Sequence, residues 1–215
     1  MAAPRVHASR PVVSTSPPRL WDPVVRLTHW GIAVVVLVNA LVTKGGSIWH
    51  VSLGWGAMAP FLLCMVWGVL GPVEARFSAF PPNPAAALAH LRQLAVGRVK
   101  IHPSHNPAGA LMVYGFWIAL CVVIWSGLVL TGGATPMHIA NDKAAVASGD
   151  RSALILKDEA GENESPGRKT VEEVHKMAAN LLLFLAALHV AGVLVESRAT
   201  RRNLLAPMLL GKRRR

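Results

Sequence analysis

Four stretches of this chain are apolar over the thickness of a lipid bilayer, and they constrain its fold more than any other feature. They cover about residues 24–42, 50–70, 107–130 and 174–195. A helix needs about 20 apolar residues to cross a membrane, and soluble core helices do not reach that length repeatedly. Only 15% of the residues are charged, against about 25% in soluble domains. The sequence predicts an all-α integral membrane protein built as a four-helix transmembrane bundle.

The distribution of basic residues predicts the orientation of this bundle. The chain has 22 Lys and Arg residues and a formal net charge of +11. Of the 22, 15 fall at the two termini or around the connection between the second and third spans. The positive-inside rule therefore predicts that the N and C termini are both cytoplasmic. Because the positive charge follows membrane topology and forms no basic recognition face, we expect no nucleic-acid partner.

The segments outside the spans differ in composition. Residues 1–20 form a basic, proline-rich arm that we expect to be disordered. The domain itself covers residues 21–212, and residues 213–215 end a basic tail. The connection 131–173 is expected outside and carries eight acidic against five basic residues. A second connection contains a predicted interfacial helix, Pro84 to Val96, with His90 on its polar face.

Two histidines lie on one face of the last span. His175 and His189 are fourteen residues apart, which is within about 40° of four helical turns and about 21 Å along the axis. His29 lies near the cytoplasmic end of the first span, and His50 opens the second span at its outer edge. Matching their depths predicts two pairs, His50 with His175 and His29 with His189.

Paired imidazoles inside a membrane indicate ligation of a cofactor. An ionisable group within the bilayer costs several kcal/mol unless it is paired or liganded. Two neutral imidazoles that face each other across a helix bundle suit bis-histidine haem ligation. The spans contain no Asp or Glu that could complete a zinc or di-iron site. The sequence therefore predicts two b-type haems with these four histidines as axial ligands.

Other residues fit the same interpretation. Small residues that would leave room for a macrocycle lie about one turn from the histidines: Ala33, Gly54, Ala178, Ala179, Ala186 and Gly192. Arg26 precedes His29 by three residues and is placed to pair with a propionate of the inner haem. His102 and His105 precede the third span, where we expect interfacial caps, with spare ligands or hydrogen-bond donors as the alternative.

The chain resembles the bacterial cytochrome b561 and nickel–iron hydrogenase b-type cytochrome family over about residues 20–212. The resemblance rests on WDPVVRLTHW, WHVSLGW, VWGVLGPVEARFSAF, HNPAGALMV and VHKMAANLLLFLAALHVAGVL, of which the last is the most specific. It implies a four-helix membrane subunit with two b haems, ligated at His29, His50, His175 and His189. It also implies electron transfer between a quinone pool and a redox partner. The long acidic outer loop departs from the family pattern and leaves the partner open.

Two versions of an electron conduit follow from this resemblance. The protein could act alone as a quinol- or superoxide-linked cytochrome in the bacterial inner membrane. It could instead anchor a larger enzyme, with a periplasmic hydrogenase or cytochrome c subunit as partner; an oligomer is compatible with both versions. A haem-free membrane anchor or small transporter subunit is the alternative from a different class, although the chain lacks the repeated halves of many transporters.

Overall fold

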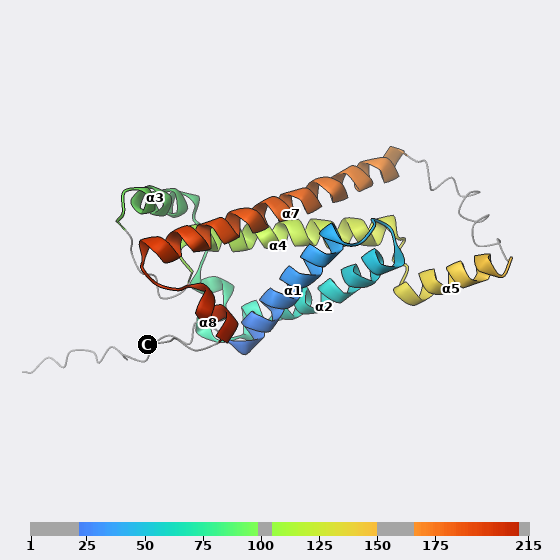
Figure 1. The fold of residues 1–215 in the computed structure, drawn as a ribbon, viewed down its shortest axis with the longest axis horizontal. Coiled ribbons are helices and arrows are strands. Elements are labelled where there is room, and N and C mark those ends of the chain that lie inside the picture. The colour runs from blue at the N-terminus through green and yellow to red at the C-terminus, as the bar shows by residue number, and fades with distance from the viewer. Residues whose placement is uncertain (1–21, 99–104, 150–165, 211–215) are drawn as a thin grey trace, which may run out of the picture.

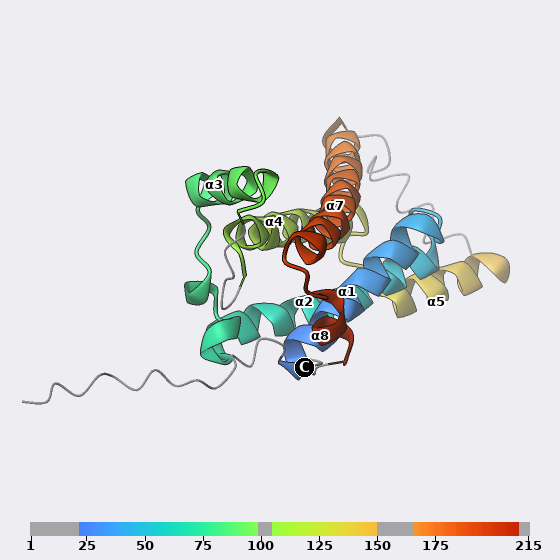
Figure 2. The same ribbon diagram turned by 60° about the vertical axis from the view of Figure 1, so that its left-hand side comes forward.

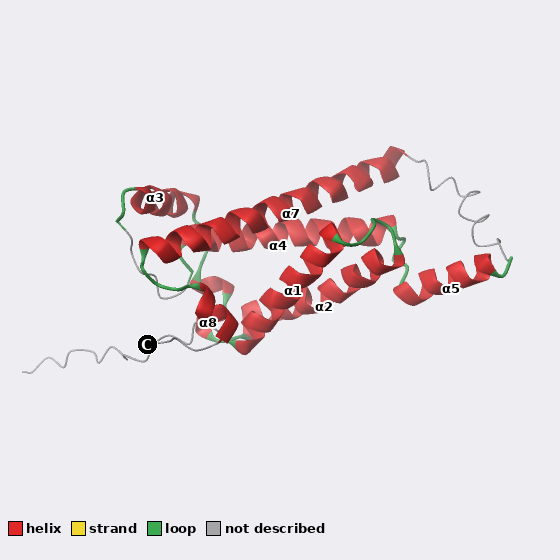
Figure 3. Cartoon of the chain, in the orientation of Figure 1, coloured by secondary structure: helices red, strands yellow, loops and turns green. Residues whose placement is uncertain are grey.

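The computed structural model describes residues 22–98, 105–149 and 166–210. The predictions for the N-terminal arm, His102 and the end of the basic tail lie outside these residues. The described part contains no strand and consists of helices joined by turns (Figure 3). Its α-helices are α1 (Pro23–Leu41), α2 (Ile48–Leu70), α3 (Pro84–Ala95), α4 (Pro107–Leu130), α5 (Pro136–Ala147), α7 (Pro166–Ala199) and α8 (Leu205–Leu210). Two short 3-10 turns, Val73–Ala75 and Phe77–Ala79, follow α2.

Four of these helices, α1, α2, α4 and α7, are long and apolar enough to cross a membrane. The fold class predicted from the sequence is thus confirmed as an all-helical protein with four candidate spans. The first three spans begin and end within two residues of the predicted bounds. The fourth helix begins at Pro166 instead of near residue 174. Its first two turns are polar, so a search for apolar length does not reveal them.

Capping side chains fix where the spans begin. The Asp22 side chain accepts hydrogen bonds from the backbone N–H groups of Val24 at 2.8 Å and Val25 at 3.4 Å, and Pro23 takes the first helical position. Ser47 accepts from the backbone N–H of His50 at 3.2 Å at the start of α2. These caps fix where α1 and α2 begin, and so they fix the positions of His29 and His50 along the bundle axis.

The spans are arranged as two helix pairs. Helix α1 packs mainly against α2, and α4 packs mainly against α7 (Figures 1 and 2). A buried apolar core joins the two pairs about halfway along the bundle. It is formed by Phe61, Ala119, Leu120 and Leu182.

Shorter helices cover opposite ends of the bundle. Helix α5 lies beside the end of α2, while α3 and α8 lie at the far end (Figure 1). The Trp55 side chain donates a hydrogen bond to the carbonyl of Ala134 at 3.3 Å, which ties α2 to the segment before α5. A helix within the long connection was not expected from the sequence.

The position predicted for His90 is wrong. The side chain is only 5% exposed, because α3 packs against α4 along the face that carries Ala87 and His90. The composition of α3 suited a helix lying on the lipid surface, but the contact with α4 turns its histidine inward.

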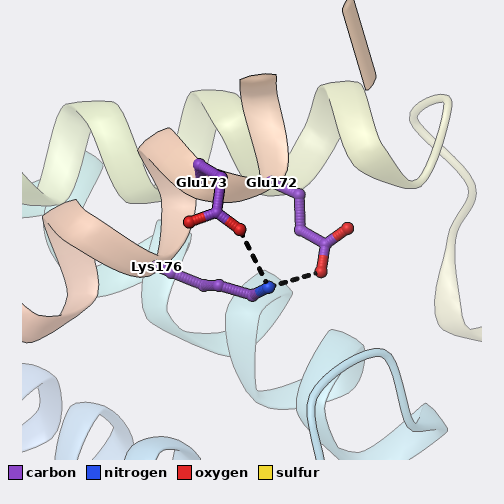
Figure 4. Close-up of polar contacts among 3 residues, drawn as sticks. All are labelled: Glu172, Glu173 and Lys176. Carbon is purple, nitrogen blue, oxygen red and sulfur yellow. Dashed lines mark hydrogen bonds and ion pairs between the residues drawn. The ribbon is translucent and has the colours of Figure 1, made fainter. Parts of the chain in front are cut away.

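Charged side chains bound the apolar length of α7. At one end Lys176 forms ion pairs with Glu172 at 2.8 Å and Glu173 at 3.3 Å, and all three side chains are exposed (Figure 4). The next charged residue along α7 is Glu196, which accepts a hydrogen bond from Asn106. At about 1.5 Å per residue the two ends lie about 30 Å apart, which equals the thickness of a hydrocarbon core.

Candidate functional site

The four predicted histidines lie together in two pairs near opposite ends of the bundle. The ring centroids of His50 and His175 are 6.1 Å apart, and those of His29 and His189 are 6.0 Å apart. We call these the outer pair and the inner pair, after the sides that the charge distribution predicts. Helix α7 contributes to both pairs, while α2 and α1 supply one partner each. Each pair therefore bridges the two helix pairs of the bundle.

Hydroxyl groups contact both imidazoles of the outer pair. The Thr43 Oγ1 atom lies 3.2 Å from Nδ1 of His50, and the Ser126 Oγ atom lies 2.9 Å from Nδ1 of His175. The Asn39 side chain donates to the carbonyl of His50 at 3.1 Å. In both imidazoles the contact engages Nδ1 and leaves Nε2 for another ligand.

Aromatic rings surround the inner pair. Trp30 packs edge-on against His29 at a centroid distance of 5.3 Å, and Phe116 packs against His189 at 5.9 Å. These ring contacts are edge-to-face, and they restrict the orientations of the His29 and His189 imidazoles. The inner pair thus lies in more apolar surroundings than the outer pair.

His105 lies beside this inner region, where its ring packs on Phe80 at a centroid distance of 4.3 Å. The residue is nonetheless exposed. The pKa of His105 is nevertheless lowered from its usual value, first because the protein packed around it disfavours the charged form and second because His189 would repel that charge. His105 is therefore near enough to the inner pair to feel its charge. Whether it acts as an interfacial cap or as a spare ligand or hydrogen-bond donor stays a prediction.

Arg26 has a partner that the sequence did not predict. Its Nε donates to the carbonyl of Met208 at 3.0 Å, and its terminal NH2 group donates to the carbonyl of Leu209 at 2.6 Å. The Trp30 side chain donates to the same Met208 carbonyl at 3.3 Å. Arg26 and Trp30, which lie on either side of His29 in the sequence, thus attach α8 to α1. The predicted role of Arg26 toward a propionate stays a prediction.

The spacing of each pair fits a metal ion held between the two imidazoles. A bond from an imidazole nitrogen to a metal is about 2.0 Å long, and that nitrogen lies about 1.2 Å from the centre of its ring. Two such ligands on opposite sides of one metal therefore place their ring centroids about 6.4 Å apart. The observed centroid distances of 6.1 and 6.0 Å are close to this value. Within residues 22–98, 105–149 and 166–210, no group of three or more His, Cys, Asp or Glu side chains could hold a metal. Two protein ligands per site suit haem iron, whose porphyrin supplies four nitrogens.

Open space beside the histidines is also compatible with a flat cofactor. Gly54 follows His50 by one turn, and Gly192 follows His189 by just under one turn. A Cβ atom added at either glycine would meet no atom within 4 Å. No neighbouring helix crowds either glycine, which is compatible with a macrocycle beside each pair.

Four spans around two such imidazole pairs define a membrane protein of the b-type cytochrome class. The chain matches the prokaryotic cytochrome b561 family over residues 20–211 and belongs to that family. The family supports b-type haem binding and electron transfer in a membrane, as the resemblance implied. Searches of curated proteins and of solved structures found no match.

The sequence did not single out the hydroxyl groups at the outer pair. Thr43 belongs to the turn before α2, and Ser126 lies in a span that contains no histidine. Serine and threonine are common in membrane helices, where they bond to the backbone of their own helix, so their identity alone carries little signal. Matching depths would have placed Ser126 at the level of His175, since both lie near the outer ends of their spans, but would not have shown which way Ser126 faces.

Proposed function

We propose that the protein is a dihaem b-type cytochrome that carries electrons across the bacterial inner membrane between the quinone pool and a redox partner. His50 and His175 would ligate the outer haem iron, and His29 and His189 the inner one. The observation that carries this proposal is the presence of two imidazole pairs with centroid distances of 6.1 and 6.0 Å in a chain of this family.

The residues of the chain supply position and surroundings, while a bound haem would supply reversible one-electron chemistry at its iron. Helix α7 runs without interruption from Pro166 to Ala199, so it fixes the separation of the two sites at about 21 Å along its axis. The apolar core of Phe61, Ala119, Leu120 and Leu182 lies between them and excludes water. With two sites at this separation, electron transfer across the membrane would proceed in shorter steps.

The two sites lie at different depths on α7. His175 directly precedes Lys176, which is exposed at the boundary of the bilayer. His189 lies seven residues before Glu196, which corresponds to about 10 Å inside the other boundary. The outer site is thus within reach of a water-soluble partner, whereas the inner site is deeper. We propose that both termini are cytoplasmic, that this partner is periplasmic, and that the acidic outer loop favours a basic surface on it.

Spectroscopy and haem analysis test the proposal directly. We expect purified protein to show a reduced-minus-oxidised b-type spectrum with two non-covalent haems for each chain. Protein purified after expression with ample haem that still lacks a b-type spectrum would exclude the proposal. It would favour the haem-free anchor or small transporter subunit.

Substitution of single ligands tests the assignment of the two pairs. His189→Leu should remove the inner haem and leave the outer one, which halves the haem content. His175→Leu should do the reverse, leaving a haem with a different midpoint potential. His138→Leu is the control, because His138 is exposed on α5 and lies in neither pair. If the two ligand variants kept both haems, the pairing would be wrong.

The partner can be identified by its association with the intact protein. Co-purification of a periplasmic hydrogenase or cytochrome c subunit would support the membrane-anchor version. Reduction of the haems by added quinol, with no such subunit present, would support a cytochrome that acts alone. Failure of quinol to reduce either haem would contradict the link to the quinone pool.

A further inference from the structure

We infer that Thr43 and Ser126 are positioning residues for the outer haem. Their hydroxyl groups accept a hydrogen bond from Nδ1 of His50 and His175, and this fixes the tautomer in which Nε2 is free to bind iron. The inference rests on the proposed dihaem function and adds two residues to its outer site.

The hydrogen-bond partners of Ser126 determine the direction of its contact with His175. Its hydroxyl has one hydrogen, and the carbonyl of Val122 lies only 2.5 Å from the oxygen. That hydrogen therefore donates to Val122. Toward His175 Nδ1, at 2.9 Å, the oxygen can only accept, so Nδ1 carries the proton. Ser126 is 0% exposed, so no solvent competes for this hydrogen bond.

Thr43 repeats this arrangement on the other side of the outer pair. Its hydroxyl oxygen lies 2.7 Å from both the backbone carbonyl and the side-chain oxygen of Asn39. The hydroxyl hydrogen therefore donates to Asn39, and Thr43 accepts from Nδ1 of His50 at 3.2 Å. The Asn39 amide donates to the His50 carbonyl at 3.1 Å, which closes the network around that histidine.

The His175 ring packs against α4 next to Ser126. A Cβ atom at Gly127 would lie 3.4 Å from Cε1 of His175 and 3.8 Å from its Nδ1. These are ordinary van der Waals distances, so the imidazole packs directly against α4 at Gly127. The hydrogen bond and the close packing thus orient the same ring.

The inner pair lacks this arrangement. In the part of the chain that the structure describes, the aromatic rings found against His29 and His189 are those of Trp30 and Phe116, and His105 lies nearby. No hydroxyl is found in contact with either ring in the way that Ser126 contacts His175. A hydrogen bond from Nδ1–H makes an imidazole a stronger electron donor and favours ferric iron. The two hydroxyls should therefore lower the midpoint potential of the outer haem only.

The experiment compares redox titrations of the full-length protein with Ser126→Ala, Thr43→Val and Thr43→Ser. Thr131→Val is the matched control. Thr131 caps α4 at the end that carries Ser126. Like Ser126, it donates to backbone carbonyls one turn earlier, at 3.0 and 3.2 Å, but its hydroxyl contacts neither histidine of the outer pair. The titration component that survives in His189→Leu identifies the outer haem.

We expect Ser126→Ala and Thr43→Val to raise the midpoint potential of the outer haem and to change its low-spin ferric EPR signal. Haem affinity at that site should fall on the order of 10-fold. The inner haem and the Thr131→Val protein should be unchanged, and Thr43→Ser should keep the wild-type potential. The inference is overturned if both hydroxyl variants match Thr131→Val, or if they alter the two haems equally. The dihaem function would survive either result, since it depends on the wild-type haem content.

Discussion

Small residues decide where aromatic rings can lie in this protein. Gly68 on α2 is buried, and a Cβ atom at that position would meet the Phe77 ring at 1.9 Å. The ring cannot easily move away, because it packs on Trp117 at a centroid distance of 4.4 Å. The Tyr114 hydroxyl also donates to the Phe77 carbonyl at 3.3 Å, which holds the backbone of that turn. Gly68 therefore allows the turn after α2 to pack against α4.

We predict that Gly68→Ala destabilises the protein by about 1–3 kcal/mol, the usual cost of overpacking a filled interior. The measurement is the apparent melting temperature in detergent, which should fall by several degrees. Gly56→Ala is the control on the same helix, because a Cβ atom there would meet nothing within 4 Å. Equal melting temperatures for the two variants would show that the Phe77 ring adapts without cost.

At the scale of elements, α8 is attached to the inner site by side chains of α1. Arg26 and Trp30 together make three hydrogen bonds to the carbonyls of Met208 and Leu209. Both residues lie within three positions of His29. Since a six-residue helix has little stability of its own, its position depends on these contacts.

We predict that Arg26→Gln releases α8. Hydrogen bonds from a charged donor contribute about 1.5–3 kcal/mol each, so amide hydrogen exchange in residues 205–210 should become at least about 10-fold faster. Arg76→Gln is the control, because Arg76 makes the same kind of bond, to the Gly71 carbonyl at 2.8 Å, without contacting α8. Unchanged exchange in α8 of the Arg26→Gln protein would contradict this role and would leave Arg26 free for the predicted propionate.

At the scale of the whole molecule, the ends of the bundle differ in what covers them. One end carries α5 and the exposed charges of Glu172, Glu173 and Lys176, while the other carries α3, α8 and most of the basic residues that the structure describes. This asymmetry predicts the orientation in the membrane, with α5 outside and α3 inside.

Cysteine labelling in intact spheroplasts tests this orientation. In a background of Cys64→Ala and Cys121→Ala, we expect Lys143→Cys on α5 to react with a membrane-impermeant maleimide. Arg92→Cys on α3 should react only after the membrane is permeabilised. Both side chains are exposed, so access from one side of the membrane decides the result. The opposite pattern would invert the topology and exchange the two haem sites between the faces.

The sequence by itself determined the four spans and the level of each histidine along its span. Apolar length and the positions of charges are local properties of a chain, so they can be counted without knowing which helices touch. Depth alone was enough to match His50 with His175 and His29 with His189, and the structure places these rings side by side.

Only the tertiary structure decided the lateral contacts. The burial of His90, the attachment of Arg26 to α8 and the contact of Ser126 with His175 each depend on how one helix is rotated about its axis against another. That rotation is set by the packing of many side chains at once, and every face of α4 is similarly apolar. The sequence therefore predicted the level of each histidine along the bundle axis. Helix packing determined which side chains on the neighbouring helices each histidine contacts.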